Sequence, residues 1–265
     1  MHQAALDALG IDARFEVWET EPGDLDGLVN DMRSGDCLGA SVTIPYKETV
    51  IGLMDEVTPK AHAIGAVNCI VVTDGRLIGH NTDGDGFIAA LRERANFDVE
   101  GKRALLIGAG GAAKALAHAL IGEGTASLII ANRTRSRAEE LAAGLRREQG
   151  FDAVPLSLDP EDIAAPAAAA NLIVNSTSIG MSSGANAGES PLPAALIPSD
   201  ALVNDIVYSP PNTPLLRDAR ARGARVLGGL PMLIYQGAVA FTLWTGREAP
   251  IDVMFQAGEK ALSEK

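Results

Sequence analysis

The chain has 265 residues, of which 47% are hydrophobic and 21% charged, and its formal net charge is −12. This length accommodates two domains of ordinary size, and the composition supports a packed interior and argues against a disordered chain. The acidic balance, without any run of lysine or arginine, argues against a nucleic-acid-binding protein. No apolar run approaches the roughly 18 residues that a membrane-spanning helix needs.

Cysteine and histidine usage excludes some classes of site. Cys37 and Cys69 lack the Cys-x-x-Cys spacing, and the four histidines lack the spacing of metal ligands. We expect no metal site and no disulfide framework, although a single bond between the two cysteines stays open. The N-terminal MHQAALDALG lacks the basic start and apolar block of a signal peptide, so we expect a cytoplasmic protein.

The first hundred residues predict a mixture of short helices and strands. The alternating FEVWE at 15–19 is typical of a strand, and Asp74-Gly75 supplies a hairpin turn. Thr82 or Asp83 is expected to cap the helix that follows the hairpin. In chain order we expect a helix at 3–9, a strand at 15–19, a helix at 24–34, a strand at 39–44, a helical stretch to about residue 54, a hairpin over 66–82 and a helix over 82–94.

A different pattern begins at residue 101. Continuous apolar runs such as RALLIG are typical of parallel strands covered on both faces, and they alternate here with helical segments. This alternation predicts an α/β fold with a Rossmann-type, doubly wound parallel sheet. We expect strands at 103–108, 126–132, 153–158, 171–177, 202–208 and 224–229, helices at 111–124 and 136–148, and two final helices at 232–246 and 250–263.

The loop between the first two of these elements has the pattern of a dinucleotide-binding loop. Gly108, Gly110 and Gly111 follow a strand and precede a helix, and Ala113 stands at the third position of the fingerprint. Gly108 permits the tight turn, Gly110 lets the backbone approach a pyrophosphate, and Ala113 is small enough for close packing of helix and strand. The free N–H groups at the start of the helix favour phosphate.

The second strand of this unit ends in an arginine-rich segment, Asn132-Arg133-Thr134-Arg135-Ser136-Arg137. NAD-specific enzymes usually carry an acidic residue at this position, which binds the ribose hydroxyls. Three arginines within five residues suit the dianionic 2′-phosphate instead. We therefore predict NADP as the cofactor.

Three polar segments of the first hundred residues lie at predicted strand ends or turns. They are SVTIPYK at 41–47, GAVN at 65–68 and GHNTDG at 79–84. Side chains at such ends can converge on a cleft. Further along, Gln236 is a polar amide in an apolar helix, where it needs a partner if buried.

Eight segments together form a pattern that covers nearly the whole chain. They are SVTIPYK, GAVN, GHNTDGDG, GAGGAAKA, NRTRSRAEEL, NSTSIGM, DIVYSPPNTPLL and MLIYQGAVAFTLWTG. In these motifs and in their order the chain resembles the shikimate dehydrogenase family. The resemblance implies an N-terminal α/β substrate domain, an NADP-binding Rossmann domain, and a cleft between them.

The resemblance also implies residue roles, while the change of pattern at residue 101 sets the domain limits. Lys47 would be the catalytic lysine and Asp83 its partner, at the substrate hydroxyl that becomes a ketone. Substrate contacts would come from Thr43, Asn68, Tyr208 and Gln236, and cofactor contacts from Gly108, Ala109, Gly110, Gly111, Ala112, Ala113, Asn132, Arg133, Thr134, Arg137, Thr177, Ile206, Gly229 and Met232. We place the substrate domain at 1–100, with helices at about 238–265 returning to it, and the NADP-binding domain at 101–237.

The resemblance implies reversible reduction of 3-dehydroshikimate to shikimate with NADPH, in the chorismate pathway to aromatic amino acids. An ammonium at Lys47 would stabilise the developing alkoxide and donate a proton, and Asp83 would orient that ammonium. The partners expected are the small-molecule substrate and, at most, a second copy of the chain, since we expect a monomer or homodimer. No nucleic acid and no membrane is expected.

The sequence departs from the family pattern at its start. Family members usually begin with a strand and a Ser-x-Ser-Pro segment before the MHQAALDALG helix, and the two serines would bind the substrate carboxylate. This sequence begins after that point, and Ser41 stands where asparagine is more usual. We expect Met1 to be an internal methionine of a natural protein that is some twenty residues longer.

Three alternatives stay open at this point. One is a quinate/shikimate dehydrogenase with relaxed cofactor choice, which the arginine segment disfavours. Another is a catalytically impaired or regulatory NADP-binding member, which the short N-terminus favours and the retained polar residues oppose. An amino-acid or hydroxy-acid dehydrogenase on the same fold would not need SVTIPYK and NTDGDG.

Overall fold

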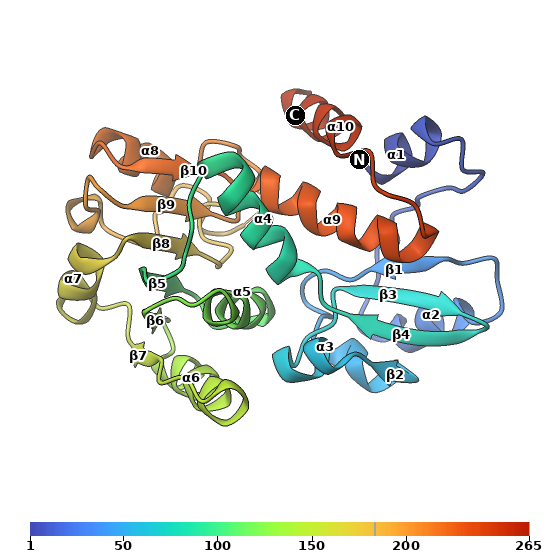
Figure 1. Ribbon diagram of the computed structural model, residues 1–265, viewed down its shortest axis with the longest axis horizontal. Coiled ribbons are helices and arrows are strands. Elements are labelled where there is room, and N and C mark those ends of the chain that lie inside the picture. Colours follow the sequence, from blue (N-terminus) through green and yellow to red (C-terminus); the bar gives the residue numbers. More distant parts are fainter. Residues whose placement is uncertain (183, 265) are drawn as a thin grey trace.

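The computed structural model describes residues 1–182 and 184–264, and it contains two β-sheets joined by helices (Figure 1). A four-stranded sheet has the order β1-β3-β4-β2, and a six-stranded parallel sheet has the order β10-β9-β8-β5-β6-β7. The predicted α/β class, with a small α/β unit followed by a Rossmann-type sheet, is confirmed.

The small sheet forms around the predicted hairpin. Asp74 and Gly75 both have positive φ, at 51° and 73°, as a tight two-residue turn between antiparallel strands requires. β1 pairs with β3 in antiparallel register, and β2 pairs with β4 in parallel register. The elements of this part are α1 (His2–Ala8), α2 (Leu25–Asp31), β1 (Gly39–Ser41), the 3₁₀ helix η1 (Thr49–Leu53), β2 (Glu56–Val57), α3 (Pro59–Ile64), β3 (Cys69–Thr73) and β4 (Arg76–His80).

The strand predicted at 15–19 is wrong. The segment has no regular secondary structure and pairs with no strand among the described residues, and Val17 is 84% exposed. Phe15 instead stacks on His2 at 4.6 Å between ring centroids, and its N–H donates to Gln3 Oε1. An alternating pattern marks a surface with one apolar side, but a strand also needs a neighbour whose backbone groups pair with its own.

The six-stranded sheet is parallel because each strand is followed by a crossover that returns the chain to the same edge. Successive side chains of β5 enter different cores, Leu106 with α5 and α6 on one face and Leu105 with α7 and α8 on the other. This double coverage explains the continuous apolar runs. The elements are β5 (Arg103–Ile107), α5 (Gly111–Gly122), β6 (Ser127–Ala131), α6 (Arg135–Gln149), β7 (Val154–Leu156), α7 (Pro160–Ala169), β8 (Leu172–Asn175), the 3₁₀ helix η2 (Ala194–Leu196), β9 (Leu202–Asp205), α8 (Pro214–Ala221) and β10 (Arg225–Leu227).

Two long helices, α4 (Asp83–Ala95) and α9 (Leu230–Thr245), pack side by side between the sheets (Figure 1). They pack tightly at Gly86, where an added Cβ would lie 2.4 Å from the backbone nitrogen of Gln236. Only glycine fits there without displacing α9. The approach brings Gln236 over the N-terminal turn of α4.

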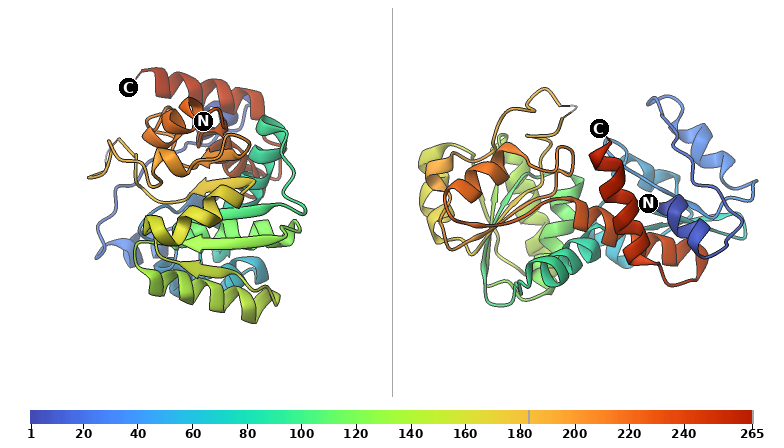
Figure 2. Two further views of the ribbon diagram at one scale, coloured as in Figure 1. Left: turned by 90° about the vertical axis from the view of Figure 1, so that its left-hand side faces the viewer. Right: turned by 90° about the horizontal axis from the view of Figure 1, so that it is seen from above.

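The last helix, α10 (Ile251–Ser263), lies against α1, so the two ends of the chain meet (Figure 2). Ile234 of α9, Phe255 of α10 and Leu6 of α1 share one buried cluster. Both cysteines are free. Within residues 1–182 and 184–264, no helix has the length and apolar character needed to cross a membrane.

Candidate active site

A lysine–aspartate pair lies at the N-terminus of α4. Lys47 Nζ donates to Asp83 Oδ2 at 2.6 Å, and the side chains of Lys47 and Asp83 are 16% and 5% exposed. Asp83 is the first residue of α4, where the positive end of the helix dipole favours a carboxylate. The Lys47 carbonyl accepts from Val67 N–H at 2.7 Å, which fixes the lysine's loop to the GAVN segment. The ammonium is therefore held in place and still reached from one side.

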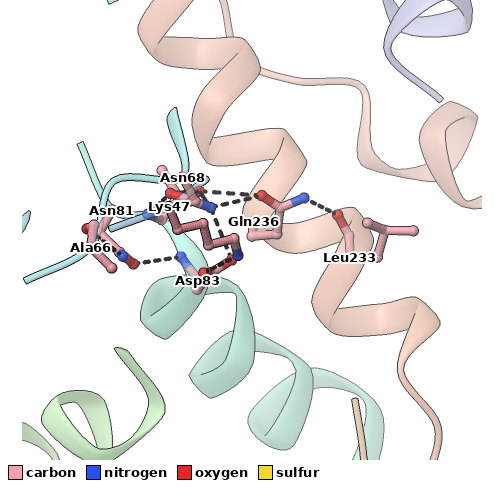
Figure 3. A network of polar contacts seen from close by, with 8 residues as sticks. Lys47, Ala66, Asn68, Asn81, Asp83, Leu233 and Gln236 are labelled. Carbon is pink, nitrogen blue, oxygen red and sulfur yellow. Dashed lines mark hydrogen bonds and ion pairs between the residues drawn. The ribbon is translucent and has the colours of Figure 1, made fainter. Parts of the chain in front are cut away.

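Asn68 connects this pair to α9 (Figure 3). Its Nδ2 lies within 2.9 Å of Asp83 Oδ1 and of Thr82 Oγ1, and within 3.2 Å of Gln236 Oε1. Because an amide nitrogen carries only two hydrogens, these three acceptors cannot all be satisfied at once. Gln236 Oε1, at the longest of the three distances, is the acceptor most readily released to another donor.

Thr82 completes the cluster in a way that the sequence did not indicate. We expected Thr82 or Asp83 to cap α4, and Thr82 stands at the N-cap but its side chain makes no capping hydrogen bond. Its N–H donates to Asn68 Oδ1 at 2.7 Å, and its side chain is buried beside Gln236. A run of polar residues directly after a strand was the available signal for such a role.

Two predicted substrate residues lie outside this hydrogen-bonded cluster. Thr43 is exposed on the loop that carries Lys47, and Tyr208 is 42% exposed after β9. The structure thus brings Lys47, Asn68, Asp83 and Gln236 together and leaves the other two side chains on the surface.

The glycine-rich loop lies between β5 and α5, at the point where the order of the six-stranded sheet reverses. Gly108 has φ of 117°, and an added Cβ would lie 2.5 Å from Ser176 Oγ, so this turn requires glycine. A Cβ at Gly110 would meet no atom within 4 Å, which leaves the N-terminus of α5 open to a ligand. Ala113 is fully buried against the sheet, while Ala109 and Ala112 are half-buried.

The arginine segment directly follows β6, the strand that lies next to β5 in the sheet. Asn132 Nδ2 donates to the carbonyl of Thr134, the residue that precedes α6. Arg135 pairs with Glu139 at 3.0 Å, one helical turn away. Arg133 and Arg137 are exposed and form no ion pair with any residue of 1–182 or 184–264. Two guanidinium groups therefore stand available beside the glycine-rich loop.

The remaining cofactor candidates follow the other strands of this sheet. Thr177 lies after β8, Ile206 after β9 and Gly229 after β10, so all face the carboxyl edge, where ligands of such sheets bind. An added Cβ at Gly229 would lie 2.2 Å from the Ile206 carbonyl oxygen. Met232, in the first turn of α9, is buried against this edge.

A buried carboxyl group supports this edge. Asp205 accepts hydrogen bonds from Thr213 Oγ, Asn175 Nδ2 and the Val207 N–H, at 2.6, 2.9 and 3.1 Å. Burial raises the pKa of Asp205, and the three donors oppose that shift. Asn175 in turn accepts from the N–H and the hydroxyl of Thr177, so Asp205 fixes the loop after β8. No sequence motif indicated this indirect role of Asp205.

The two halves of the site meet at the glycine-rich loop. An added Cβ at Gly111 would lie 3.6 Å from Lys47 Cβ, so the lysine packs directly on that loop. One residue further, Glu48 Oε2 pairs with Lys114 Nζ of α5 at 2.9 Å. Lys114 also lines a groove of about 490 Å³ together with Gly110 and Arg137. Within 1–182 and 184–264, no group of three or more His, Cys, Asp or Glu side chains could hold a metal ion.

A lysine–carboxylate pair that lies against a glycine-rich strand–loop–helix defines a dinucleotide-dependent oxidoreductase. Residues 1–70 match the model of the shikimate dehydrogenase substrate binding domain, residues 90–187 that of shikimate / quinate 5-dehydrogenase, and residues 229–257 that of the shikimate 5′-dehydrogenase C-terminal domain. The chain belongs to the shikimate dehydrogenase family, as the sequence motifs predicted.

Individual relatives agree with this assignment. A shikimate dehydrogenase (NADP(+)) from Methanopyrus kandleri is 43% identical over 97% of this chain and 88% of its own length. The structure of shikimate 5-dehydrogenase from Thermus thermophilus in complex with NADP(H) and shikimate is 39% identical, with a TM-score of 0.87 over 98% of this chain and 93% of that one. Quinate dehydrogenase from Corynebacterium glutamicum in complex with NAD is 33% identical, with a TM-score of 0.86 over 98% and 92% of the two chains.

Proposed function

We propose that this protein is an NADP-dependent shikimate dehydrogenase, which reversibly reduces 3-dehydroshikimate to shikimate in the pathway to chorismate and the aromatic amino acids. The observation that carries the proposal is the Lys47–Asp83 pair, 2.6 Å apart, packed against the glycine-rich loop. Similarity to shikimate dehydrogenases over nearly the whole chain supports the same conclusion.

The residues around the loop suit NADP. The open N-terminus of α5 at Gly110 and Gly111 accepts a pyrophosphate, and Arg133 and Arg137 suit a 2′-phosphate. We assign further cofactor contacts to Gly108, Ala109, Ala112, Ala113, Asn132, Thr134, Thr177, Ile206, Gly229 and Met232, which lie on the loop or along the same sheet edge. When bound, NADPH supplies the hydride for the carbonyl carbon of the substrate.

Lys47 is assigned the proton transfer. When hydride adds to a carbonyl carbon, the oxygen gains negative charge, which an ammonium stabilises and then neutralises by donating a proton. Asp83 holds the Lys47 ammonium through Oδ2, and its other oxygen is held by Asn68. Because the carboxylate is fixed at both oxygens, the ammonium is oriented before substrate arrives.

Asn68 and Gln236 are assigned to the substrate hydroxyls. The crowded acceptors around Asn68 Nδ2 leave Gln236 Oε1 able to accept from a hydroxyl, while Gln236 Nε2 stays bonded to the Leu233 carbonyl at 2.8 Å. We propose that Thr43 and Tyr208 contribute from the surface of the cleft, where both are exposed.

The test is a steady-state absorbance assay at the nicotinamide band, with shikimate and quinate each supplied with NADP and with NAD. We expect the highest kcat/KM with shikimate and NADP. The absence of turnover with shikimate, or a preference for NAD, would contradict the proposal.

A quinate/shikimate dehydrogenase with relaxed cofactor use is the second candidate, favoured by the similarity to a quinate dehydrogenase solved with NAD. It predicts comparable kcat/KM for quinate and shikimate in the same assay. Arg133 and Arg137 disfavour it, since neither is needed for a ribose hydroxyl.

We also propose the domain limits 1–100 and 101–237, with the C-terminal helices from about residue 238 joining the first domain. α9 runs unbroken across residue 238, and its later part packs on the small sheet through Trp244, which donates to the Ile70 carbonyl at 2.8 Å. We further propose that the protein is cytoplasmic and that it is a monomer or homodimer. Light scattering on the purified protein would test the oligomeric state.

A further inference from the structure

Asn81 lies between the end of β4 and the start of α4, and its side chain is buried, with 4% of the residue exposed. Its Oδ1 accepts the backbone N–H of Asp83 at 3.1 Å, and its Nδ2 donates to the Ala66 carbonyl at 2.9 Å (Figure 3). One amide side chain therefore joins the start of α4 to Ala66, which lies 15 residues before Asn81 in the sequence.

Each of these two segments carries a member of the candidate site. The Asp83 carboxylate pairs with Lys47, and Ala66 lies two residues before Asn68. The first N–H groups of a helix have no partner within the helix, and the Thr82 side chain does not cap α4. The Asn81 side chain supplies the missing acceptor, at the residue whose carboxylate must be placed.

We infer that Asn81 is a positioning residue, which sets the distance between Asp83 and Asn68 and thereby holds Lys47 in its reactive orientation. The inference rests on the proposed function for its rate measurement. The Asn81 side chain is buried, and both of its hydrogen bonds go to backbone groups, so it acts through the backbone of Asp83 and Ala66.

The geometry predicts which part of the side chain matters. Asn81→Ala removes both hydrogen bonds and leaves two buried backbone groups without partners. Asn81→Ser loses the bond to Ala66 but keeps a hydroxyl that can accept the N–H two residues ahead, as serine commonly does in turns. Positioning therefore predicts that Asn81→Ser retains more activity than Asn81→Ala.

Asn171 offers a control for the loss of a side-chain-to-backbone hydrogen bond far from the site. Its Oδ1 also accepts a backbone N–H, that of Arg103 at 3.0 Å, but it lies at the opposite edge of the parallel sheet from the glycine-rich loop. This hydrogen bond is exposed, whereas the two made by Asn81 are buried, and Asn171→Ala removes it without touching Lys47 or Asp83. The folded fraction of each variant therefore corrects kcat for the larger destabilisation expected of Asn81→Ala.

The experiment compares kcat, KM for NADPH and folded fraction for the wild-type protein and the three variants. We expect Asn81→Ala to lower kcat at least tenfold with KM for NADPH within twofold, because the hydrogen bonds of Asn81 go to Asp83 and Ala66 and not to the glycine-rich loop itself. The kcat of Asn81→Ser should lie between those of Asn81→Ala and wild type. The kcat of Asn171→Ala should stay within twofold of wild type. Equal kcat in Asn81→Ala and Asn171→Ala, or no gain with Asn81→Ser, would overturn the inference.

A second measurement does not depend on turnover. Pairing with Asp83 and burial protect Lys47 from trinitrobenzenesulfonate, and peptide mass spectrometry reports its rate of modification. We expect this rate to rise at least threefold in Asn81→Ala and to stay unchanged in Asn171→Ala. If wild type fails to oxidise shikimate, the proposed function fails, and unchanged Lys47 modification in Asn81→Ala would separately refute the role of Asn81.

Discussion

Gly86 controls how closely α4 and α9 pack, and so where Gln236 lies. A methyl group at Gly86 would lie 2.4, 2.6 and 2.7 Å from the backbone nitrogen, Cβ and Cα of Gln236. Real Cβ atoms do not approach other atoms this closely, and a backbone cannot rotate aside as a side chain can. Gly86→Ala must therefore push α9 away from α4 and carry Gln236 away from Asn68.

Two opposing contributions determine how much Gly86→Ala changes the free energy of unfolding. Overpacking typically costs about 1–3 kcal/mol, and a clash with helix backbone belongs at the upper end, about 3 kcal/mol. Replacing a helical glycine by alanine contributes about 1 kcal/mol of helix propensity in the other direction. The net loss of unfolding free energy is then about 2 kcal/mol.

Gly144 provides the control, because it lies within α6 and an added Cβ would approach only the end of the Arg147 side chain, at 3.9 Å. Urea unfolding should show Gly144→Ala to be more stable than wild type by about 0.5–1 kcal/mol and Gly86→Ala less stable by about 2 kcal/mol. KM for shikimate should rise in Gly86→Ala alone. Equal stability changes in the two variants would refute the packing argument.

Two further predictions concern charge. Arg133→Ala should raise KM for NADPH about tenfold or more and leave KM for NADH nearly unchanged, since a lost charge-assisted hydrogen bond costs about 1.5–3 kcal/mol; equal effects in steady-state kinetics would exclude the 2′-phosphate contact. Burial lowers the pKa of His2 from 6.5 to about 4. The unfolded chain therefore binds this proton more tightly, so stability is complete above pH 6.5 and falls by up to about 3 kcal/mol towards pH 4. Urea unfolding at a series of pH values should show no such decrease in the unfolding free energy of His2→Phe. An unfolding free energy that depends on pH as steeply in His2→Phe as in wild type would count against the assignment.

Elements whose formation depends on local sequence signals could be predicted. The buried run before Gly108 and the glycines themselves predicted β5, the loop and α5 at nearly their observed limits. Helices α3, α7 and α8 were not predicted, although α3 and α8 both have a Thr-Pro start: Thr58 and Thr213 each accept a backbone N–H with Pro at the first helical position. A local signal for both helices was therefore present in the sequence.

Features that depend on distant partners were not predictable. FEVWE at 15–19 has the pattern of a strand, but whether it becomes one is decided by a neighbouring strand. Lys47, Asn68 and Asp83 were identified through motifs, whereas Asn81, in the same motif, acquires its role only from the position of the Ala66 carbonyl. Packing decided these cases, and a single sequence does not record which segments meet.

The central claim is that Lys47, held by Asp83 against the glycine-rich loop, performs the proton transfer of shikimate oxidation. The most direct measurement is kcat for shikimate with NADP in wild type and Lys47→Ala, together with NADPH affinity from nicotinamide fluorescence. The account predicts a fall in kcat of at least about 100-fold with NADPH affinity within about threefold of wild type, since positioned proton transfer contributes on the order of 10²–10⁴ in rate. Near-normal turnover by Lys47→Ala would contradict it.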